Sequence, residues 1–346
     1  MSILLVLNRH MNMQWKILES KDIWERFLSE HSSGELFQSW LWGEVQNKSG
    51  TNIYRFGLIE KGKLLGIAQI VIVKSRRGSF LHVRHGPVFA TQNQMLWKEF
   101  FRNATAFGKS VGAQFIRISP LIIGSEKHHM IFSSFGLIYS PIHEVDAERC
   151  WVLDIDKSEE EILAGMRKST RYEIRHAQKM GVTVQISNSK ESVRNFLELY
   201  RETSERHGFV AHRLIQEEFE VFSREDKAII LSGYYKGDCI AGAIILFYAG
   251  QAIYHHGASL KSNAPVSHLV QWHAILEAKK RGIKLYNFYG IAPDNKPNHP
   301  WRGITVFKKG FGGREINYIH SYDYILSPLY FFGYIVELIR KCVLGY

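Results

Sequence analysis

The sequence predicts an α/β protein made of two copies of one structural unit, each with a mixed sheet flanked by helices. Two observations support this fold class. The chain has 346 residues, which is long for a single hydrophobic core. Strand-like and helix-like segments also recur in the same order in both halves. Apolar residues make up 45% of the chain and charged residues 22%, as in ordinary globular proteins.

Each half contains a predicted β-hairpin. A Lys-Gly turn joins two apolar β-type runs in residues 55–73 and again in residues 231–248. A helical pattern that ends at a glycine follows in each half, and a short strand-like run comes next. These helices are expected at 97–112 and 270–282, and these strands at 114–119 and 284–289.

The boundary between the halves is predicted near residues 145–150, where an acidic loop precedes the strand-like run Cys150–Ile155. Asp156 or Ser158 then begins a helix whose first turn holds three glutamates, where the helix dipole favours them. We therefore expect domains at 1–149 and 150–319.

Lysine and arginine (44) exceed aspartate and glutamate (33) by 11, and the excess is spread along the chain. This favours a positive surface on a folded body over a disordered basic tail. RNA, a phosphorylated substrate or an anionic membrane surface would suit such a surface. An unspecialised basic enzyme remains the alternative.

The three cysteines lie far apart and form no CxxC pair, which fits a reducing cytoplasm and argues against a disulfide framework or a zinc site. The histidine pairs 128–129 and 255–256 lack the spacing that places two ligands on one helix face, so we predict no metal site.

The N-terminal apolar run is too short for a signal peptide, and no run of about 18 apolar residues could span a membrane. The C-terminal segment 326–346 combines aromatic residues with Arg340 and Lys341. It could lie at a membrane interface or dock on the first domain, and the two alternatives are compatible.

Residues 305–313, T-V-F-K-K-G-F-G-G, place Lys308 and Lys309 between Phe307 and Phe311, and three glycines follow the lysines at 310, 312 and 313. Positive charge beside aromatic rings and flexible backbone suits an anion, or an oxyanion that forms during acyl transfer. The alternative is a glycine-rich turn after a strand, with solvated lysines.

Residues 166–181 form a strongly basic predicted helix, on which cations and a tyrosine share one face. Such a face suits a phosphate backbone, although charged helix faces are often only solvated. Arg213 precedes another helical segment and could either bind a phosphate or pair with Glu217 or Glu218. The shared face consists of Lys168, Tyr172, Arg175 and Lys179, flanked by Arg167 and Arg171.

The aromatic run 36–42, which includes Trp42, could stack on a sugar or base but is more typical of a core. The sequence has no G-x-S-x-G, no Walker loop and no G-x-G-x-x-G. It therefore offers no signature of a serine hydrolase, a P-loop NTPase or a dinucleotide-binding enzyme.

Taken in order, the motifs resemble the FemABX family of peptidoglycan bridge-forming aminoacyltransferases over residues 14–329. The matching motifs are F-Q-S-W-x-W, G-P-V, L-D-I with E-E-E-I-L-x-x-M-R-K-S-T-R, R-H-G-F, Y-H-H-G-A-S and F-K-K-G-F-G-G. The resemblance implies two tandem GNAT-like acyltransferase domains, the first completed by residues 320–346. This chain has no heptad insertion, so it looks like a member without the coiled-coil arm.

The family reaction moves an amino acid from aminoacyl-tRNA to a stem-peptide amine of lipid II or its UDP-linked soluble precursor. The resemblance thus implies aminoacyl-tRNA as co-substrate, no other cofactor and no metal. We expect a cytoplasmic monomer with peripheral contact at the inner face of the plasma membrane.

The resemblance also implies site residues. Lys308 with Phe307 matches the Phe-Lys pair associated with the tRNA acceptor end, and Arg213 matches an arginine that holds the precursor's phosphates. Tyr254 and His256 lie on the strand that lines the acceptor channel. The tRNA-contact residues implied are Arg167, Lys168, Arg171, Arg175 and Lys309, the last of which could also be simply solvated.

Two departures concern the nucleotide end of the pocket. Members that use the soluble precursor carry a lysine shortly after the tryptophan that matches Trp42, where this chain has Gln46, with Lys48 nearby. They also have an acid where Ser119 precedes Pro120. Together with the aromatic C-terminus, these differences favour a lipid-linked acceptor.

Two other functions stay open from sequence. One is an acyl-CoA-dependent GNAT N-acyltransferase, although the R/Q-x-x-G-x-G/A turn that grips pyrophosphate is missing. The other is a non-catalytic protein that binds tRNA or a membrane.

Overall fold

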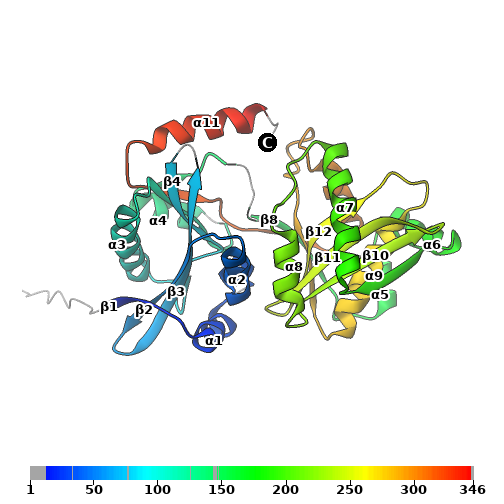
Figure 1. Cartoon of the computed structure of the whole chain (residues 1–346), viewed down its shortest axis with the longest axis horizontal. Helices are drawn as coiled ribbons and strands as arrows, with labels where there is room; N and C mark the ends of the chain where they lie inside the picture. The colour runs from blue at the N-terminus through cyan, green and yellow to red at the C-terminus, as the bar shows by residue number, and fades with distance from the viewer. Residues whose placement is uncertain are drawn as a thin grey trace, which may run out of the picture.

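The computed structural model describes residues 13–32, 34–75, 78–124, 126–142, 146 and 148–343. They form two mixed sheets, of eight and seven strands, that lie side by side with helices packed on them (Figure 1). The predicted α/β fold class is confirmed. The N-terminal apolar run and most of the acidic boundary loop lie outside the described residues.

The first sheet has the strand order β1-β2-β3-β4-β6-β15-β7, and β5 pairs with β3 at one side. Its strands are β1 (Met13–Ile17), β2 (Ile53–Glu60), β3 (Lys63–Ser75), β4 (Gly78–Arg84), β5 (Val88–Phe89), β6 (Phe115–Ser119), β7 (Leu137–Tyr139) and β15 (Tyr322–Ile325). The accompanying helices are α1 (Lys21–His31), η1 (Leu36–Gln38), α2 (Trp40–Lys48), α3 (Gln94–Ser110) and α4 (Glu126–Ser134).

The second sheet has the order β14-β8-β13-β12-β11-β10-β9. Its strands are β8 (Arg149–Asp154), β9 (Thr183–Ser187), β10 (Ala228–Tyr235), β11 (Asp238–Tyr248), β12 (Gln251–Ser259), β13 (Leu285–Gly290) and β14 (Arg314–Asn317). Its helices are α5 (Glu159–Gly165), α6 (Lys168–Lys179), α7 (Lys190–His207), α8 (Ile215–Ser223), α9 (Val266–Lys280) and α10 (Arg302–Gly310). Helix α11 (Tyr330–Val343) ends the described chain.

The two sheets repeat one pattern of strand pairing. Strands β4 and β6 pair parallel in the first sheet, as β12 and β13 do in the second, and the other described pairs are antiparallel. Helices α3 and α9 provide the crossovers that these parallel pairs require. Both halves therefore share the order hairpin, further strand, helix, strand.

Both Lys-Gly turns have the geometry that tight hairpins favour. Lys61 and Gly62 have φ of 48° and 80°, and Lys236 and Gly237 have φ of 54° and 94°. Positive φ at both central residues is typical of the type I′ turn, whose twist matches that of the flanking strands.

The C-terminal segment completes the first sheet, because β15 lies between β6 and β7. A buried ion pair fixes it there: Arg117 of β6 donates from Nε and Nη2 to the two carboxylate oxygens of Asp323, both at 2.7 Å. The Tyr330 hydroxyl donates to the same carboxylate at 2.9 Å. We propose that residues 1–149 with 320–346 form one domain and residues 150–319 the other.

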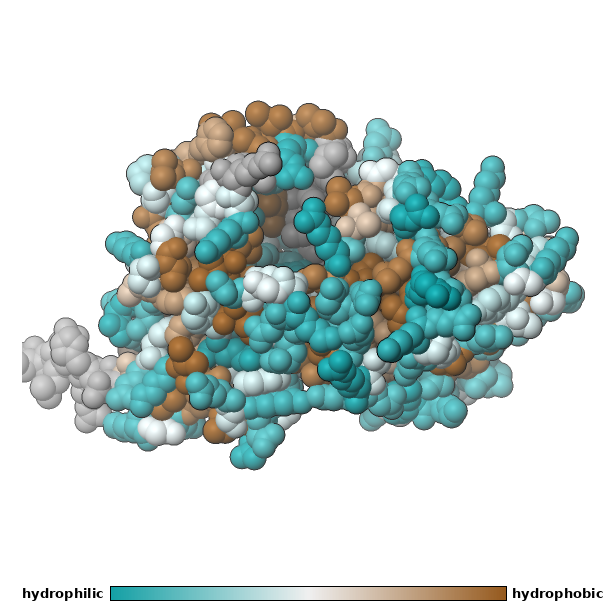
Figure 2. All heavy atoms as spheres, in the orientation of Figure 1, coloured by the Kyte–Doolittle hydropathy of each residue, from teal (hydrophilic) through white to brown (hydrophobic). Residues whose placement is uncertain are grey.

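Helix α11 follows directly and packs on the first half at its beginning, with a further contact near its end, where Lys341 Nζ donates to the Ile142 carbonyl oxygen at 3.2 Å. Tyr330 is buried and packs on Phe115 with ring centres 5.0 Å apart. Most of the helix exposes apolar side chains, and a hydrophobic stretch runs along its position in Figure 2. None of the described helices is both long enough and apolar enough to cross a bilayer.

One hydrophobic core joins the two halves. Leu41, Trp42 and Val45 of α2 are buried in the same cluster as Phe219 and Phe222 of α8. The aromatic run 36–42 is therefore mainly core, which was the more typical of its two interpretations.

Candidate functional site

The F-K-K-G-F-G-G stretch is not the glycine-rich turn that its composition favours, because residues 302–310 form helix α10. Gly310 ends this helix where it packs on α6; a Cβ added there would lie 2.5 Å from Thr170 Oγ1. Gly312 and Gly313 have φ of 81° and 102°, so only the residues after the helix use the conformational freedom of glycine.

Lys308 lies in the last turn of α10 with its side chain buried at 7% exposure. Its Nζ donates to the Gly290 carbonyl oxygen at 2.6 Å and lies 5.9 Å from the centre of the Tyr254 ring. It forms no ion pair with a described carboxylate, and the nearby Cys150 thiol stays neutral because burial raises its pKa to about 12. Burial lowers the pKa of Lys308 to about 8. Lys308 is thus a buried amine with no counter-ion in the described part of the chain, which is typical of functional sites.

The neighbours of Lys308 have separate roles. The Phe307 ring packs on His268 and Phe311, with ring centres 5.0 and 5.3 Å apart, and so covers one side of the helix. Lys309 pairs with Asp294, with Nζ 2.7 Å from Oδ1. Lys309 is therefore engaged in an ion pair within the protein.

Tyr289 is a residue that the sequence did not single out. Its φ is +65°, in the left-handed region that non-glycine residues rarely occupy, and it precedes the Gly290 carbonyl that holds Lys308. Its buried hydroxyl has no hydrogen-bond partner among the residues that the structure describes, and its ring lies 5.1 Å from that of His255. A strained backbone and an unsatisfied hydroxyl together mark this position as functional.

A β-bulge in β12 decides where its side chains point. Ile244 of β11 pairs with His256 while Ile245 pairs with Tyr254, so His255 is the extra residue. A bulge places two consecutive residues on one face of the sheet, where a regular strand would alternate them. Tyr254 therefore faces Lys308 and the α9 side, whereas His255 and His256 both face α8.

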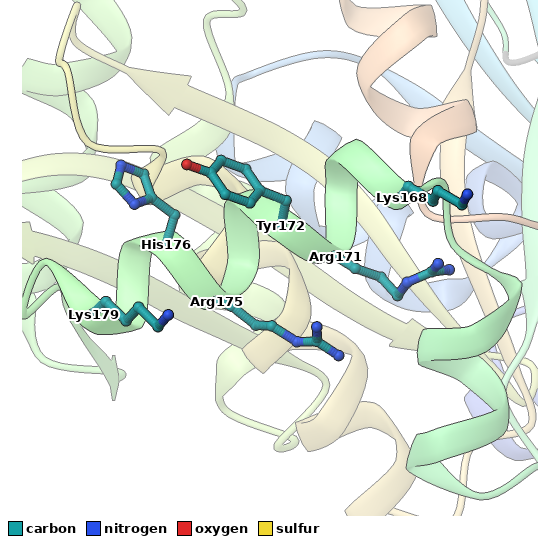
Figure 3. A pocket seen from close by; sticks show the side chains of 6 residues that line it. All are labelled: Lys168, Arg171, Tyr172, Arg175, His176 and Lys179. Carbon is teal, nitrogen blue, oxygen red and sulfur yellow. The ribbon is translucent and has the colours of Figure 1, made fainter.

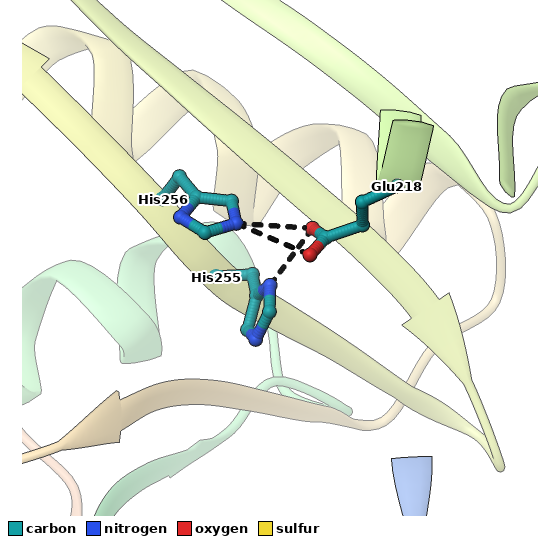
Figure 4. Close-up of side chains that lie close together, drawn as sticks. All are labelled: Glu218, His255 and His256. Carbon is teal, nitrogen blue, oxygen red and sulfur yellow. Dashed lines mark hydrogen bonds and ion pairs between the residues drawn. The ribbon is translucent and has the colours of Figure 1, made fainter. Parts of the chain in front are cut away.

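The carboxylate of Glu218 on α8 accepts hydrogen bonds from both histidines (Figure 4). His255 Nδ1 lies 2.8 Å from Oε1, and His256 Nε2 lies 3.1 Å from the same oxygen. Burial disfavours the charged carboxylate, but the two histidines outweigh it and hold the pKa of Glu218 below its usual range. These three side chains form the one group among the described residues whose ligand atoms are close enough to share a metal ion.

The other predicted substrate-binding residues lie around this cluster. Arg213 is exposed just before α8, and within the described chain it forms no ion pair with Glu217 or Glu218. Trp42 contacts the His255 ring edge-on at 6.2 Å. Gln46 lies one turn further along α2 and is half-buried, whereas Lys48 pairs with Glu220 at 2.6 Å.

The first half contributes a second buried polar cluster, centred on Asp146. Its carboxylate accepts hydrogen bonds from Ser119 Oγ and Arg84 Nε, both at 2.7 Å. Asp146 thus supplies an acid beside Ser119, the position where the sequence lacks one. His85 belongs to this cluster, since its Nε2 lies 2.8 Å from the Asp146 carbonyl oxygen. The Phe37 ring links the cluster to the other half, because it lies 4.3 Å from the His85 ring and 6.2 Å from the His255 ring.

Helix α6 presents the predicted basic face (Figure 3). Lys168, Arg175 and Lys179 are exposed, and Tyr172 stacks on His176 at 5.4 Å. Arg171 instead holds the end of α5, donating to the carbonyls of Leu163, Ala164 and Met166. The remaining lining residues form an open, positively charged surface.

Arg167, predicted as a tRNA contact, is exposed at the start of α6 and its Nη1 lies 3.5 Å from the Val306 carbonyl oxygen. The described site therefore has four parts: the buried Lys308, the Glu218 cluster on the other side of β12, the Asp146 cluster of the first half, and the α6 surface.

Comparisons with known proteins agree with this arrangement. The model of the FemAB family matches residues 20–134, 142–232 and 233–337. The lipid II:glycine glycyltransferase of Staphylococcus haemolyticus (strain JCSC1435) is 22% identical, over 88% of this chain and 92% of that protein. The crystal structure of FemX has a TM-score of 0.80 at 19% identity and covers 94% of this chain and 100% of its own. A tandem GNAT protein from the clavulanic acid biosynthesis pathway has a TM-score of 0.60 at 9% identity, over 91% of this chain and 99% of its own. These structures share the fold of two GNAT-like domains.

Proposed function

Because this chain belongs to the FemAB family, we propose that it transfers an aminoacyl group to an amine on the stem peptide of a peptidoglycan precursor. We propose aminoacyl-tRNA as the donor and lipid II as the acceptor. The Staphylococcus haemolyticus relative is a lipid II:glycine glycyltransferase, which supports both the reaction class and the acceptor. The reaction needs no cofactor besides the charged tRNA.

The proposed chemistry is aminolysis of the tRNA ester. The neutral acceptor amine attacks the ester carbonyl, an amide C–N bond forms, the ester C–O bond breaks, and the tRNA hydroxyl leaves with a proton that the amine gives up. Negative charge develops on the carbonyl oxygen in the transition state, so a positioned positive group lowers the barrier. Lys308 is the residue that we assign to this oxyanion.

The observation that carries this assignment is the burial of the Lys308 ammonium with no acidic partner among the described residues. A carboxylate beside it would neutralise the charge, whereas the Gly290 carbonyl only orients it. An oxyanion that forms nearby would therefore be stabilised by a positive charge that no described carboxylate neutralises.

The α6 surface supports the choice of tRNA as donor. Its exposed lysines and arginine, with the exposed Tyr172 ring, suit contacts to phosphates and to an unpaired base. Helix α6 begins at Lys168, near the end of α10. The preceding residue, Arg167, donates a backbone hydrogen bond to the carbonyl oxygen of Gly310, the last residue of α10.

The exposed face of α11 supports a lipid-linked acceptor at a membrane surface. Apolar and aromatic side chains occupy this face, and cations lie near its end, as in helices that rest in the head-group region. We propose a monomer at the inner face of the plasma membrane. The exposed apolar residues are Leu329, Phe331, Phe332, Ile335, Leu338, Ile339 and Val343.

The proposal is tested with purified protein, lipid II in detergent, and tRNA charged with a series of labelled amino acids. We expect label in the lipid-linked product with at least one amino acid, detected by mass spectrometry. Lys308→Ala should lower kcat by about 100-fold or more and leave the lipid II affinity nearly unchanged, because the charge acts in the transition state. Lys63→Ala, at an exposed lysine of β3 with no assigned role, is the control and should keep most of the activity.

Two results would contradict the proposal. Absence of transfer from every charged tRNA, with acylation in the presence of an acyl-CoA, would make the chain an acyl-CoA-dependent transferase. Binding of tRNA without any transfer, unchanged by Lys308→Ala, would make it a binding protein.

A further inference from the structure

We propose that Glu218, His255 and His256 form a binding site for a divalent transition-metal ion, with Zn²⁺ as the best-suited ion. Two imidazoles and one carboxylate are the protein ligands of many zinc sites that keep a fourth position open. The proposal does not depend on aminoacyl transfer, since it rests only on these three side chains and their surroundings.

The bulge in β12 makes the site possible. Two adjacent histidines in a regular strand would point to opposite faces and could not share an ion. Because His255 is the extra residue opposite β11, both rings turn toward Glu218, as Figure 4 shows. The expectation of no metal drew on ligand spacing along a helix and on the family resemblance; the spacing argument does not apply here, because these histidines lie on β12.

The distances are close to those of a zinc site. Zinc binds nitrogen and oxygen at about 2.0–2.2 Å in a tetrahedron, which places its ligand atoms about 3.3 Å apart. The Glu218 Oε1 atom lies 2.8 Å from His255 Nδ1 and 3.1 Å from His256 Nε2, and all three ligand atoms lie within 4.8 Å of one another. Small side-chain rotations would admit the ion.

The charge of the cluster also favours a cation. Glu218 is 2% exposed, and its ion-pair partners among the described residues are these two histidines, with no lysine or arginine. Among the described residues, the carboxylate thus faces two imidazoles, which are common metal ligands, and no permanently charged side chain. A divalent ion would neutralise it.

Metal binding would replace the present hydrogen bonds. Each imidazole proton that now faces Glu218 would move through solvent to the other ring nitrogen, which leaves the inner lone pair for the ion and changes no net charge on the ring. His212, whose ring centre lies 5.5 Å from that of His256, is exposed beside the open position and could occupy it, as could water.

The experiment titrates chelator-treated full-length protein with Zn²⁺ in competition with a chromogenic chelator. We expect one ion per chain and an X-ray absorption spectrum of nitrogen and oxygen ligands at about 2.0–2.1 Å. Glu218→Gln keeps the size of the side chain but removes its charge, and should weaken binding by more than about 100-fold. Circular dichroism checks that each variant folds, and His256→Asn replaces Glu218→Gln if that variant does not.

His128→Asn provides the matched control, because His128 and His129 are the other adjacent pair and lie on α4. This variant should bind zinc as the parent does. Failure of the parent to bind zinc at micromolar concentrations would overturn the proposal and leave the cluster as a hydrogen-bonded network. Equal binding by Glu218→Gln, or loss of binding in His128→Asn, would overturn it as well.

Discussion

Lys308 shows how far a single residue can be predicted from sequence. Its aromatic neighbours and its place in the motif order indicated a functional lysine. Its burial and its bond to the Gly290 carbonyl could not be predicted, since both depend on β13 and α10 meeting in space. Tyr289 and Glu218 were missed because no local pattern marks them. The bulge at His255 was missed because a strand is read with a period of two residues.

The lowered pKa of Lys308 predicts a pH dependence of stability. The unfolded chain holds this proton up to about pH 10.5, whereas the folded chain releases it near pH 8. Between these values the unfolded state binds more protons, so the free energy of unfolding rises with pH and the destabilisation caused by Lys308 becomes smaller. Below pH 8 its charged form is buried at a cost of about 3 kcal/mol, since one pKa unit corresponds to about 1.4 kcal/mol.

Lys308→Met should therefore be more stable than the parent at pH 7, and the difference should shrink as the pH approaches 10. Urea unfolding at a series of pH values measures this. Lys309→Met, which removes an exposed ion pair instead, should show no such trend. A constant difference between Lys308→Met and the parent from pH 7 to pH 10 would refute the assignment.

At the scale of elements, the periodic helices and both hairpins were predicted closely. The Lys-Gly turns could be predicted because they depend only on local backbone geometry. The start of α5 could be predicted because Ser158 and Glu161 form a capping box there. Helix α10 was missed because three glycines within four residues suggest a turn. Its packing against α6 stabilises the helix at that point, where Gly310 leaves room for Thr170.

The α6 surface should make tRNA binding sensitive to salt. Replacing Lys168, Arg175 and Lys179 by alanine should weaken tRNA binding and reduce the slope of log affinity against log salt by about 1 for each lost contact. Filter binding at several salt concentrations measures both quantities. A control variant that also loses three positive charges, with alanine at the exposed Lys16, Lys63 and Lys98, should leave the slope nearly unchanged. Equal effects of the two triple variants would mean that only net charge matters.

The apolar face of α11 should bind membranes. Serine at Phe332, Ile335 and Ile339 should weaken co-sedimentation with vesicles of phosphatidylglycerol and phosphatidylcholine by at least about tenfold, because each side chain loses its burial among lipid tails. Ile17, Ile123 and Met130 are comparably exposed elsewhere and serve as the control set for the same substitution. Unchanged sedimentation of the α11 variant would show that this face does not contact lipid.

For the whole molecule, the duplication was visible in the sequence, but the order of strands was not. In the second sheet, β8 comes before the hairpin in sequence but pairs with β13, the strand after the crossover helix. In the first sheet, β15 takes the equivalent place beside β6, although it comes from the C-terminal end of the chain. Local patterns carry no information on such long-range pairing. The resemblance to a known family implied only that the C-terminus completes the first domain, and it gave no order of strands.

The Arg117–Asp323 pair should be essential to the first half. Asp323→Ala leaves a buried guanidinium unpaired and should cost about 3–5 kcal/mol of unfolding free energy. Hydrogen exchange should locate the loss in the strands beside β15. Asp294→Ala, which removes an exposed partner of Lys309, should change stability by less than about 1 kcal/mol. A loss confined to the second sheet would contradict this role for the pair.

The position of β15 also sets the order in which the protein can fold during synthesis. About 180 residues separate the end of β7 from the start of β15, which corresponds to roughly 10–40 s of translation. Every strand of the second sheet emerges from the ribosome before β15 does. The half that is encoded second can therefore finish first, while β6 and β7 wait with open edges that a chaperone would have to cover.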